Sequence, residues 1–189
     1  MYIISNRNKP VFILLTVIIS FFLLLSCKTE TDSNDTDVED VKVYFSPGGE
    51  CDKKIIAIIN NASSEINIAV YSFNRTVIID ALVAAEARGV TVKVVVDANE
   101  AKDSAQSHAT SLLEAAKFEF RKKTFPRNTT AMHDKFMIVD KKIVTTGSFN
   151  WTTNATENND ENLIIITSKN TAAAYNEEFN RIWNSAAGE

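Results

Sequence analysis

Cysteine and histidine are scarce in this sequence, whose 189 residues include two of each. No group of cysteines, histidines or carboxylates has the spacing of a metal site, so the sequence gives no sign of a bound metal. If Cys27 is modified as argued below, Cys51 has no partner and an intramolecular disulfide is excluded. A lone cysteine is most often a small buried apolar residue. The fold is therefore expected to depend on its hydrophobic core.

The sequence also lacks an internal repeat and an excess of one charge over its folded part. Three of the 20 Lys and Arg residues and six of the 24 Asp and Glu residues precede Val41, which leaves 17 basic and 18 acidic residues. Global charge therefore neither supports nor excludes nucleic acid as a partner. A hydrophobic content of 45% and a charged content of 23% are ordinary for a globular protein, and the length predicts one folded domain.

One long hydrophobic run lies outside this domain. Residues 11–25 are almost entirely apolar and follow two basic residues. At about 15 residues the run is shorter than the roughly 20 that a membrane-spanning helix needs, and it is typical of a secretory signal. It ends in Leu24-Leu25-Ser26-Cys27, which resembles the lipobox of bacterial lipoproteins. We expect a signal peptide over residues 1–26, lipidation of Cys27 and a cell-envelope location outside the cytoplasm. An uncleaved membrane anchor is the alternative.

The next segment, residues 27–40, is polar and acidic. Its composition provides nothing for a core, so it is expected to be a solvated, disordered tether. Lys28 follows Cys27 at the position where an Asp marks inner-membrane retention in enteric bacteria. The outer membrane is therefore the favoured location, and residues 41–189 are the expected folded domain.

Apolar periodicity divides the folded domain into strands and helices. Strands are predicted at residues 41–45, 66–73, 90–96, 118–121, 132–140, 143–148 and 163–167. Helices are predicted at residues 52–62, 77–88, 107–116 and 171–185. Gly89 stands at the usual terminal position of the second helix. The alternation of the two predicts an α/β sandwich, in which helices flank a mixed β-sheet.

The chemically informative residues lie between positions 133 and 162. His133-Asp134-Lys135 is followed by Asp140, by Gly147-Ser148-Phe149-Asn150 and by Glu161-Asn162. Alternate side chains share one face of a strand, so His133 and Lys135 are expected to project together, as are Ser148 and Asn150 after the hairpin. An imidazole is a competent nucleophile toward phosphorus. Lys135 and Asn150 can hold the non-bridging oxygens of a phosphate, and Ser148 can add a hydrogen bond.

These motifs resemble those of the phospholipase D superfamily. The pattern His-x-Lys-x4-Asp followed by Gly-Ser-x-Asn is similar to the signature of that family, and the segment around Glu161-Asn162 looks like its bacterial single-motif nuclease (Nuc-like) branch. Similar segments precede the motif in the same order, namely Tyr44-Phe45-Ser46-Pro47, Ile68-Ala69-Val70-Tyr71-Ser72-Phe73 and Arg88-Gly89-Val90. The resemblance therefore covers nearly the whole chain from Val43 onward.

The resemblance implies a mechanism and a partner. It makes Glu161 the carboxylate that orients His133. Asp140 has an odd offset from His133 and is expected on the other strand face, which leaves a catalytic or a structural role open. The chemistry needs a second acid–base group, and this chain has a single motif. The resemblance therefore implies a homodimer in which His133 of both subunits meets at a two-fold axis, with no metal or other cofactor.

A basic cluster before the catalytic strand suggests the substrate. Four positive charges fall within seven residues and fit a track for a phosphate backbone, namely Arg121, Lys122, Lys123 and Arg127. Phe125 and Trp151 are candidates for stacking on bases. Because phosphate contacts carry no base information, the sequence predicts a nuclease of low specificity.

Two other functions remain open. The same histidine chemistry cleaves lipid phosphodiesters, so a hydrolase of phosphatidyl lipids or cardiolipin is the first alternative. The polar residues 127–130 favour nucleic acid over lipid. A non-enzymatic surface lipoprotein that binds polyanions is the second alternative, although it predicts a damaged constellation, and every member of this one is present. His108 receives no functional role.

Overall fold

The computed structural model describes residues 40–48, 50–126 and 130–188. The signal peptide, Cys27, the tether and Arg127 lie outside the described residues, so these predictions stay untested. The strands are β1 (Asp40–Ser46), β2 (Glu65–Val70), β3 (Thr91–Asp97), β4 (Glu119–Lys123), β5 (Lys135–Val139), β6 (Ile143–Gly147), β7 (Glu161–Thr167) and β8 (Ala187–Gly188). The helices are α2 (Glu50–Asn61), α3 (Thr76–Ala87), the 3-10 turn η1 (Glu100–Lys102), α4 (Ser107–Ala115), α5 (Thr153–Glu157) and α6 (Lys169–Asn184).

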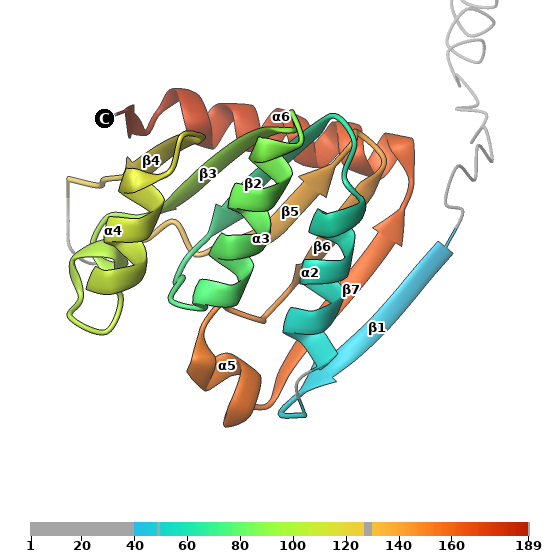
Figure 1. Cartoon of the computed structure of the whole chain (residues 1–189), viewed down its shortest axis with the longest axis horizontal. Helices are drawn as coiled ribbons and strands as arrows, with labels where there is room; N and C mark the ends of the chain where they lie inside the picture. Colours follow the sequence, from blue (N-terminus) through green and yellow to red (C-terminus); the bar gives the residue numbers. More distant parts are fainter. Residues whose placement is uncertain (1–39, 49, 127–129, 189) are drawn as a thin grey trace, which may run out of the picture. The chain divides into compact units, whose positions relative to one another are not determined.

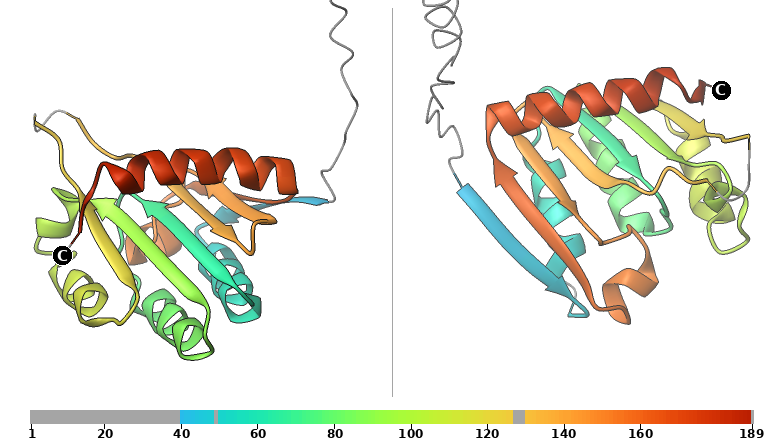
Figure 2. Two further views of the ribbon diagram at one scale, coloured as in Figure 1. Left: turned by 90° about the horizontal axis from the view of Figure 1, so that it is seen from above. Right: turned by 180° about the vertical axis from the view of Figure 1, so that it is seen from behind.

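The described strands form one mixed sheet in the order β1-β7-β6-β5-β2-β3-β4-β8. β2 pairs in parallel with β3, and β3 with β4, whereas the remaining neighbours are antiparallel. Helices α2, α3 and α4 cover one face and α6 crosses the other (Figures 1 and 2). This architecture confirms the predicted α/β class with a mixed sheet flanked by helices.

The sheet separates two hydrophobic cores. The larger core lies under α2, α3 and α4 and includes Ile55, Leu82 and Met137. The smaller core lies under α6 and includes Phe136 and Phe179. Cys51 is fully buried in the larger core, in agreement with its expected apolar role. Within the described residues, no helix has the length and apolar character that crossing a bilayer requires.

The predicted catalytic strands are shorter than expected at the ends that carry the motif. β5 begins at Lys135 instead of residue 132, because the Met132 N–H donates to the Asp97 carboxylate (3.0 Å) and leaves the ladder. β6 ends at Gly147 instead of Ser148. The prediction that strand alternation aligns His133 with Lys135 and Ser148 with Asn150 is therefore wrong, because His133 and Asn150 lie in loops. The periodicity also missed η1, α5 and β8.

Candidate active site

His133 and Lys135 meet at the start of β5. The His133 side chain is exposed, whereas Lys135 is only 9% exposed. Lys135 Nζ lies 3.0 Å from His133 Nδ1 and also donates to the His133 carbonyl oxygen. Burial lowers the pKa of Lys135, and the charges of Asp134, Glu161 and Glu100 oppose that shift. The structure thus brings the two predicted residues together, although a loop does so instead of a shared strand face.

The contact between Lys135 and His133 defines the state of the imidazole. A lysine ammonium can only donate hydrogen bonds, so His133 Nδ1 accepts and the ring proton lies on Nε2. For Nε2 to attack phosphorus, the proton must instead lie on Nδ1 and point to an acceptor. This contact must therefore open before Nε2 can attack. Phosphate oxygens that bind the Lys135 ammonium would draw it away from Nδ1.

Ser148 and Asn150 lie on the loop that follows β6. Ser148 Oγ accepts hydrogen bonds from Asn162 N (3.1 Å) and Asn162 Nδ2 (3.2 Å). Gly147 has φ +143°, and a Cβ there would lie 2.3 Å from the Asn162 carbonyl oxygen, so glycine is required for this close approach. Asn150 Oδ1 is buried and has no hydrogen-bond partner among the described residues. Ser148 Oγ thus has both acceptor sites filled from Asn162, and its hydroxyl can still donate, while Asn150 Oδ1 is an unused acceptor.

The loop that carries Asn150 is held by the segment that follows β2. Trp151 N donates to the Ser72 carbonyl oxygen (3.1 Å), and the Trp151 carbonyl accepts from the N–H groups of Asn74 (2.9 Å) and Arg75 (3.0 Å). Arg75 in turn donates through two nitrogens to the buried Asp52 carboxylate of α2. A bridge of the sheet type therefore links the loops after β2 and β6.

Glu161 stands at the start of β7 without a hydrogen bond to His133 among the described residues. Its Oε1 accepts from Asn159 Nδ2 (3.2 Å). Its charge acts on Lys135, whose pKa it raises against the effect of burial. The structure therefore places Glu161 within electrostatic reach of the site, whereas its orientation of His133 stays a prediction.

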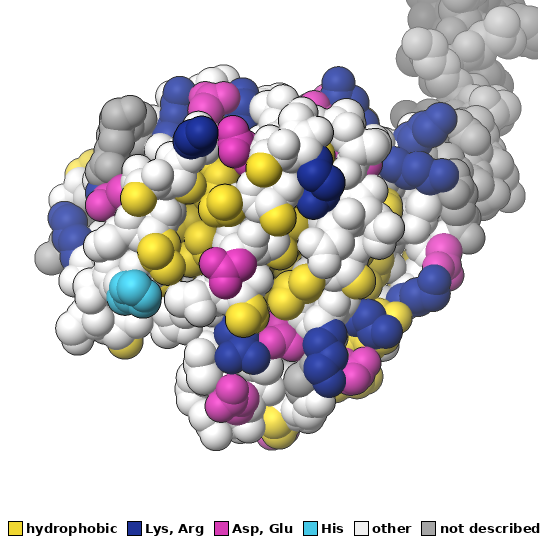
Figure 3. Space-filling view, in the orientation of Figure 1, with side chains coloured by type: hydrophobic (Ala, Val, Ile, Leu, Met, Phe, Trp, Pro, Cys, Tyr) yellow, Lys and Arg dark blue, Asp and Glu magenta, His cyan; other side chains and the backbone are white. Residues whose placement is uncertain are grey.

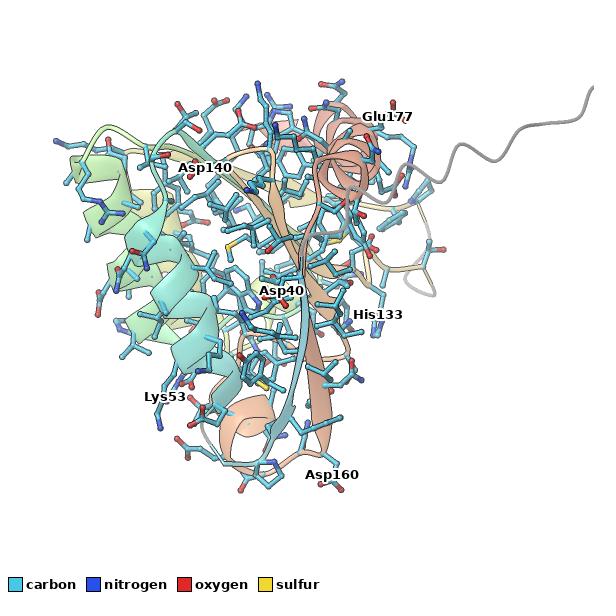
Figure 4. The ribbon with its side chains drawn as sticks, turned by 90° about the vertical axis from the view of Figure 1, so that its right-hand side faces the viewer. Asp40, Lys53, His133, Asp140, Asp160 and Glu177 are labelled. Carbon is cyan, nitrogen blue, oxygen red and sulfur yellow. The ribbon has the colours of Figure 1, made fainter. Side chains whose placement is uncertain are left out.

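Asp140 lies at the opposite end of β5 from His133, and Figure 4 shows the two side chains well apart. Its carboxylate accepts from five donors, the N–H and hydroxyl groups of Ser63 and Ser64 and the N–H of Glu65. These bonds overcome the opposing effect of burial and lower the pKa of Asp140 to about 2. Between the two roles that the sequence left open, these contacts favour a structural one, in which Asp140 fixes the α2–β2 connection.

The three described members of the predicted basic cluster each make contacts within the chain. Arg121 donates to the Trp183 carbonyl oxygen (2.8 Å) and stacks on the Trp183 ring, Lys122 pairs with Glu114 (2.8 Å), and Lys123 donates to the Ser185 carbonyl oxygen (2.9 Å). These contacts hold β4 against α4 and the end of α6. On the face shown in Figure 3, Lys and Arg side chains are interspersed with acidic ones.

The expectation that Trp151 stacks on bases is wrong. Its side chain is 1% exposed and packs edge-on against Phe73, with 5.1 Å between ring centroids. It belongs to the larger core and anchors the loop after β6. Phe125 packs near Lys123, at 5.1 Å from its Nζ to the ring centroid.

Three residues around the site were missed by sequence reasoning. The Tyr71 ring packs against the His133 ring, with 4.4 Å between centroids. Asp97 is 1% exposed, and its carboxylate accepts from Met132 N (3.0 Å), Asn99 N (2.8 Å) and Glu100 N (3.2 Å). Glu100 lies beside the Tyr71 hydroxyl. The available signal was that Tyr71 and Asp97 stand at the carboxyl ends of parallel strands, where sites in α/β folds gather.

Comparison with known proteins agrees with the fold and the grouped residues, which together define an α/β protein with a His-x-Lys site at the end of the central strand β5. Residues 55–183 match the family model described as "Cardiolipin synthase, PLD-like domain". The chain therefore belongs to the phospholipase D–like family.

Two kinds of relatives are similar to the chain. It is 34% identical over 135 residues to a protein named phospholipase D from Rickettsia prowazekii, which covers 71% of this chain and 63% of that protein. The chain thus matches slightly less than two thirds of that relative's length. The crystal structure of Nuc from Salmonella typhimurium has a TM-score of 0.74 at 34% identity and covers 79% of this chain and 97% of Nuc. NucT from Helicobacter pylori has a TM-score of 0.70 at 26% identity, covering 79% of this chain and 99% of NucT.

Proposed function

We propose that this chain is a phosphodiesterase that uses His133 as its covalent nucleophile and cleaves nucleic acid with low sequence specificity. The observation that carries the proposal is the contact between an exposed imidazole and a nearly buried ammonium, with Nζ 3.0 Å from Nδ1. An imidazole next to a fixed cation is suited to attack an anionic phosphodiester, because the cation neutralises the charge that repels the nucleophile. Similarity to Nuc and NucT over most of the domain supports nucleic acid as the substrate class.

The proposed reaction proceeds in two displacements at phosphorus. His133 Nε2 forms a bond to phosphorus while the bond from phosphorus to the leaving oxygen breaks, and a second acid–base group protonates that oxygen. Water then attacks the phosphohistidine, the P–N bond breaks, and the same group accepts the water proton. Lys135 and Asn150 hold the non-bridging oxygens in both steps. A carboxylate such as Glu161 accepts a hydrogen bond from the Nδ1–H of the attacking ring, and that proton stays on the ring through both steps.

The second acid–base group is proposed to come from a second copy of this chain. Three apolar side chains of the edge strand β1 are unusually exposed, with fractions of 53% for Val41, 49% for Val43 and 67% for Phe45. Phe45 pairs in register with Asn162, which bonds Ser148, so this apolar face borders the site. An exposed apolar patch beside a functional site is typical of an interaction surface. A two-fold interface here would bring a second His133 toward the first.

The proposed activity is tested with the full-length chain in mild detergent, incubated with plasmid and single-stranded DNA in EDTA. We expect cleavage that survives EDTA and is lost in His133→Ala. His108→Ala is the matched control, because His108 is an exposed histidine on α4, and this variant should keep full activity. Cleavage that persists in His133→Ala, or that requires a divalent metal, contradicts the proposed mechanism.

The proposed dimer is tested by placing a charge on the apolar face. Phe45→Asp is expected to yield a monomer in light scattering and to lose most nuclease activity while keeping its fold. Val83→Asp is the matched control, since Val83 is 44% exposed on α3, on the other side of the sheet. An active monomeric Phe45→Asp variant would show that one chain suffices.

Hydrolysis of a lipid phosphodiester is the second candidate function. It is supported by the relatives named phospholipase D and by a protein named mitochondrial cardiolipin hydrolase from Canis lupus familiaris, 32% identical over 138 residues, which cover 72% of this chain and 52% of that protein. Vesicles that contain cardiolipin or phosphatidylglycerol provide the test. Release of lipid products by the wild type and not by His133→Ala, together with intact DNA, would shift the substrate assignment to lipid.

A further inference from the structure

One aromatic side chain contacts both reactive groups of the site. The Tyr71 ring centroid lies 4.4 Å from that of His133, at an interplanar angle of 43°. Lys135 Nζ lies 4.9 Å from the Tyr71 ring centroid, within the range of a cation–π contact. Tyr71 directly follows β2 and is partly buried. A single ring therefore borders the imidazole and the ammonium at once.

The backbone of Tyr71 holds the same segment independently of the ring. Its N–H donates to the Asp134 carbonyl oxygen (2.8 Å), between His133 and Lys135. The last in-register pair of the two strands is Val70 with Lys135, so this bond extends the ladder by one step. Because a backbone contact survives a side-chain replacement, substitutions of Tyr71 test the ring and leave the strand pairing in place.

The Glu100 carboxylate lies near the Tyr71 hydroxyl. Burial and the neighbouring Glu100 carboxylate raise the pKa of Tyr71, with a smaller contribution from the charge of Asp97. Glu100 begins η1, and its N–H donates to the Asp97 carboxylate (3.2 Å). Tyr71 and Glu100 also line the same small cavity. The hydroxyl thus faces a turn that is itself attached, through Asp97, to the chain beside His133.

We propose that Tyr71 is a positioning residue, whose ring sets the placement of His133 and Lys135. The inference rests on the proposed role of His133 as nucleophile. His133 is exposed, so without the ring its side chain would sample several rotamers. The ring restricts these rotamers and offers the ammonium a favourable surface from which it can move to a bound phosphate.

The charges around Lys135 predict a pH signature for the pair. The groups that raise the pKa of Lys135 are Asp134, Glu161 and Glu100, and burial lowers it. Removing the charge of Glu100 therefore lowers the pKa of Lys135. Activity that requires the ammonium should then fall at a lower pH, so the alkaline limb of kcat/KM should shift downward in Glu100→Gln. A purely structural role of Glu100 does not predict this shift.

The first test compares Tyr71→Leu, which removes the ring, with Tyr71→Phe, which keeps it, in the full-length chain with single-stranded DNA as substrate. Misplacement of a reacting group by about 1 Å costs on the order of 100-fold in rate, so we expect kcat of Tyr71→Leu to fall about 10- to 100-fold with little change in KM. Tyr71→Phe should recover most of that loss. Tyr175→Leu is the matched control, because Tyr175 lies on α6 and its ring packs on Phe136 in the smaller core instead of on His133.

A second readout does not depend on turnover. The chain has two histidines, so NMR of ¹³C-histidine-labelled protein resolves His133, assigned with His133→Ala, from His108. The Tyr71 ring should impose a ring-current shift on His133 that disappears in Tyr71→Leu, persists in Tyr71→Phe and leaves His108 unmoved. If the wild type cleaves no phosphodiester, the proposed function fails, and the NMR result alone still decides whether Tyr71 places His133.

Two outcomes overturn the positioning role. One is a Tyr71→Leu variant that keeps both the wild-type His133 signals and the wild-type kcat. The other is a Tyr71→Phe variant that keeps the ring and still loses as much kcat as Tyr71→Leu. If Tyr71→Leu does not fold, Tyr71→Met, which also lacks a ring, takes its place, and wild-type His133 signals together with wild-type kcat in that variant overturn the role in the same way.

Discussion

Two polar residues of one motif, His133 and Asp140, flank strand β5 and differ in how fully the chain satisfies their hydrogen-bonding groups. At the end that follows the strand, the Asp140 carboxylate accepts from five donors of the α2–β2 connection. At the end that precedes it, the exposed His133 ring contacts one cation and one aromatic ring. Asn150 Oδ1, on the loop after β6, lacks a partner among the described residues.

Within this short motif, the residue that stabilises the fold is therefore distinct from the residue that is available for chemistry. A carboxylate whose acceptor sites are filled from its own chain stabilises the fold and has little capacity left for a substrate. Polar groups with unfilled capacity cost stability and remain available for a ligand.

The largest effect is expected at the reactive end, from Lys135→Gln. Loss of a fixed donor to the transition-state oxygens typically costs about 100- to 1000-fold in kcat, and we expect a loss of that size. Burial already disfavours the ammonium, so thermal stability should not fall. Lys141→Gln, a change of an exposed lysine just beyond the other end of β5, is the control and should keep its activity. Equal losses in the two variants would erase the distinction between the ends.

The structural end should show the reverse behaviour in Asp140→Asn. The neutral amide cannot accept from all five donors, so N–H and hydroxyl groups of the α2–β2 connection lose their partners, and we expect the free energy of unfolding to fall by about 2 kcal/mol. Urea denaturation measures this change, and kcat per folded molecule should stay near the wild-type value. Asp160→Asn, at an exposed carboxylate, should leave both quantities unchanged. A stable but inactive Asp140→Asn protein would return Asp140 to the catalytic group.

Acid should weaken the structural end in a defined window. The pKa of Asp140 is about 2 in the folded chain, below the ordinary value of 3.8 for an aspartate side chain. Because the folded value is the lower one, the stabilisation is complete above the unfolded pKa and is lost as the pH falls toward 2. It amounts to at most about 2 kcal/mol after allowance for solvent screening. Denaturation of the wild type and Asp140→Asn from pH 6 to pH 2 should converge; parallel curves contradict this account.

The smallest effect is expected from the basic residues of β4. Lys123 donates to the Ser185 carbonyl oxygen, so Lys123→Gln should leave the salt dependence of KM for DNA unchanged. A lysine that contacts phosphate would instead reduce the slope of the logarithmic plot by about 1. A slope change of that size would restore the basic cluster as a substrate track.

Much of the fold was predictable because its signals are local. Runs such as residues 90–96 and the helical spacing at residues 52–62 gave the elements within a few residues, and their alternation gave the class. The short α5 was missed because its start depends on one cap, Thr152 Oγ1 accepting from Ala155 N (3.1 Å). The strand predicted from Met132 begins only at Lys135, because the Met132 N–H bonds the carboxylate of Asp97, 35 residues before Met132 in the sequence.

The candidate site was predictable in its membership and less so in its geometry. The spacing of His133 and Lys135 identified the pair, whereas their contact comes from a loop. Trp151 was assigned to substrate because an aromatic residue beside a motif gives no sign of its burial. Tyr71 and Asp97 escaped notice because their contacts join β2 and β3 to the loop before β5, and such long-range contacts leave no periodicity in the sequence.

The most direct test of the central claim is to trap the covalent intermediate on His133. The full-length chain would be mixed rapidly with an oligonucleotide, quenched with alkaline denaturant, which preserves phosphohistidine, and analysed by mass spectrometry of its peptides. A nucleotidyl adduct is expected on His133, absent from His108 and from the Lys135→Gln protein at early times. Product that accumulates with no adduct, or with an adduct on another residue, would contradict it.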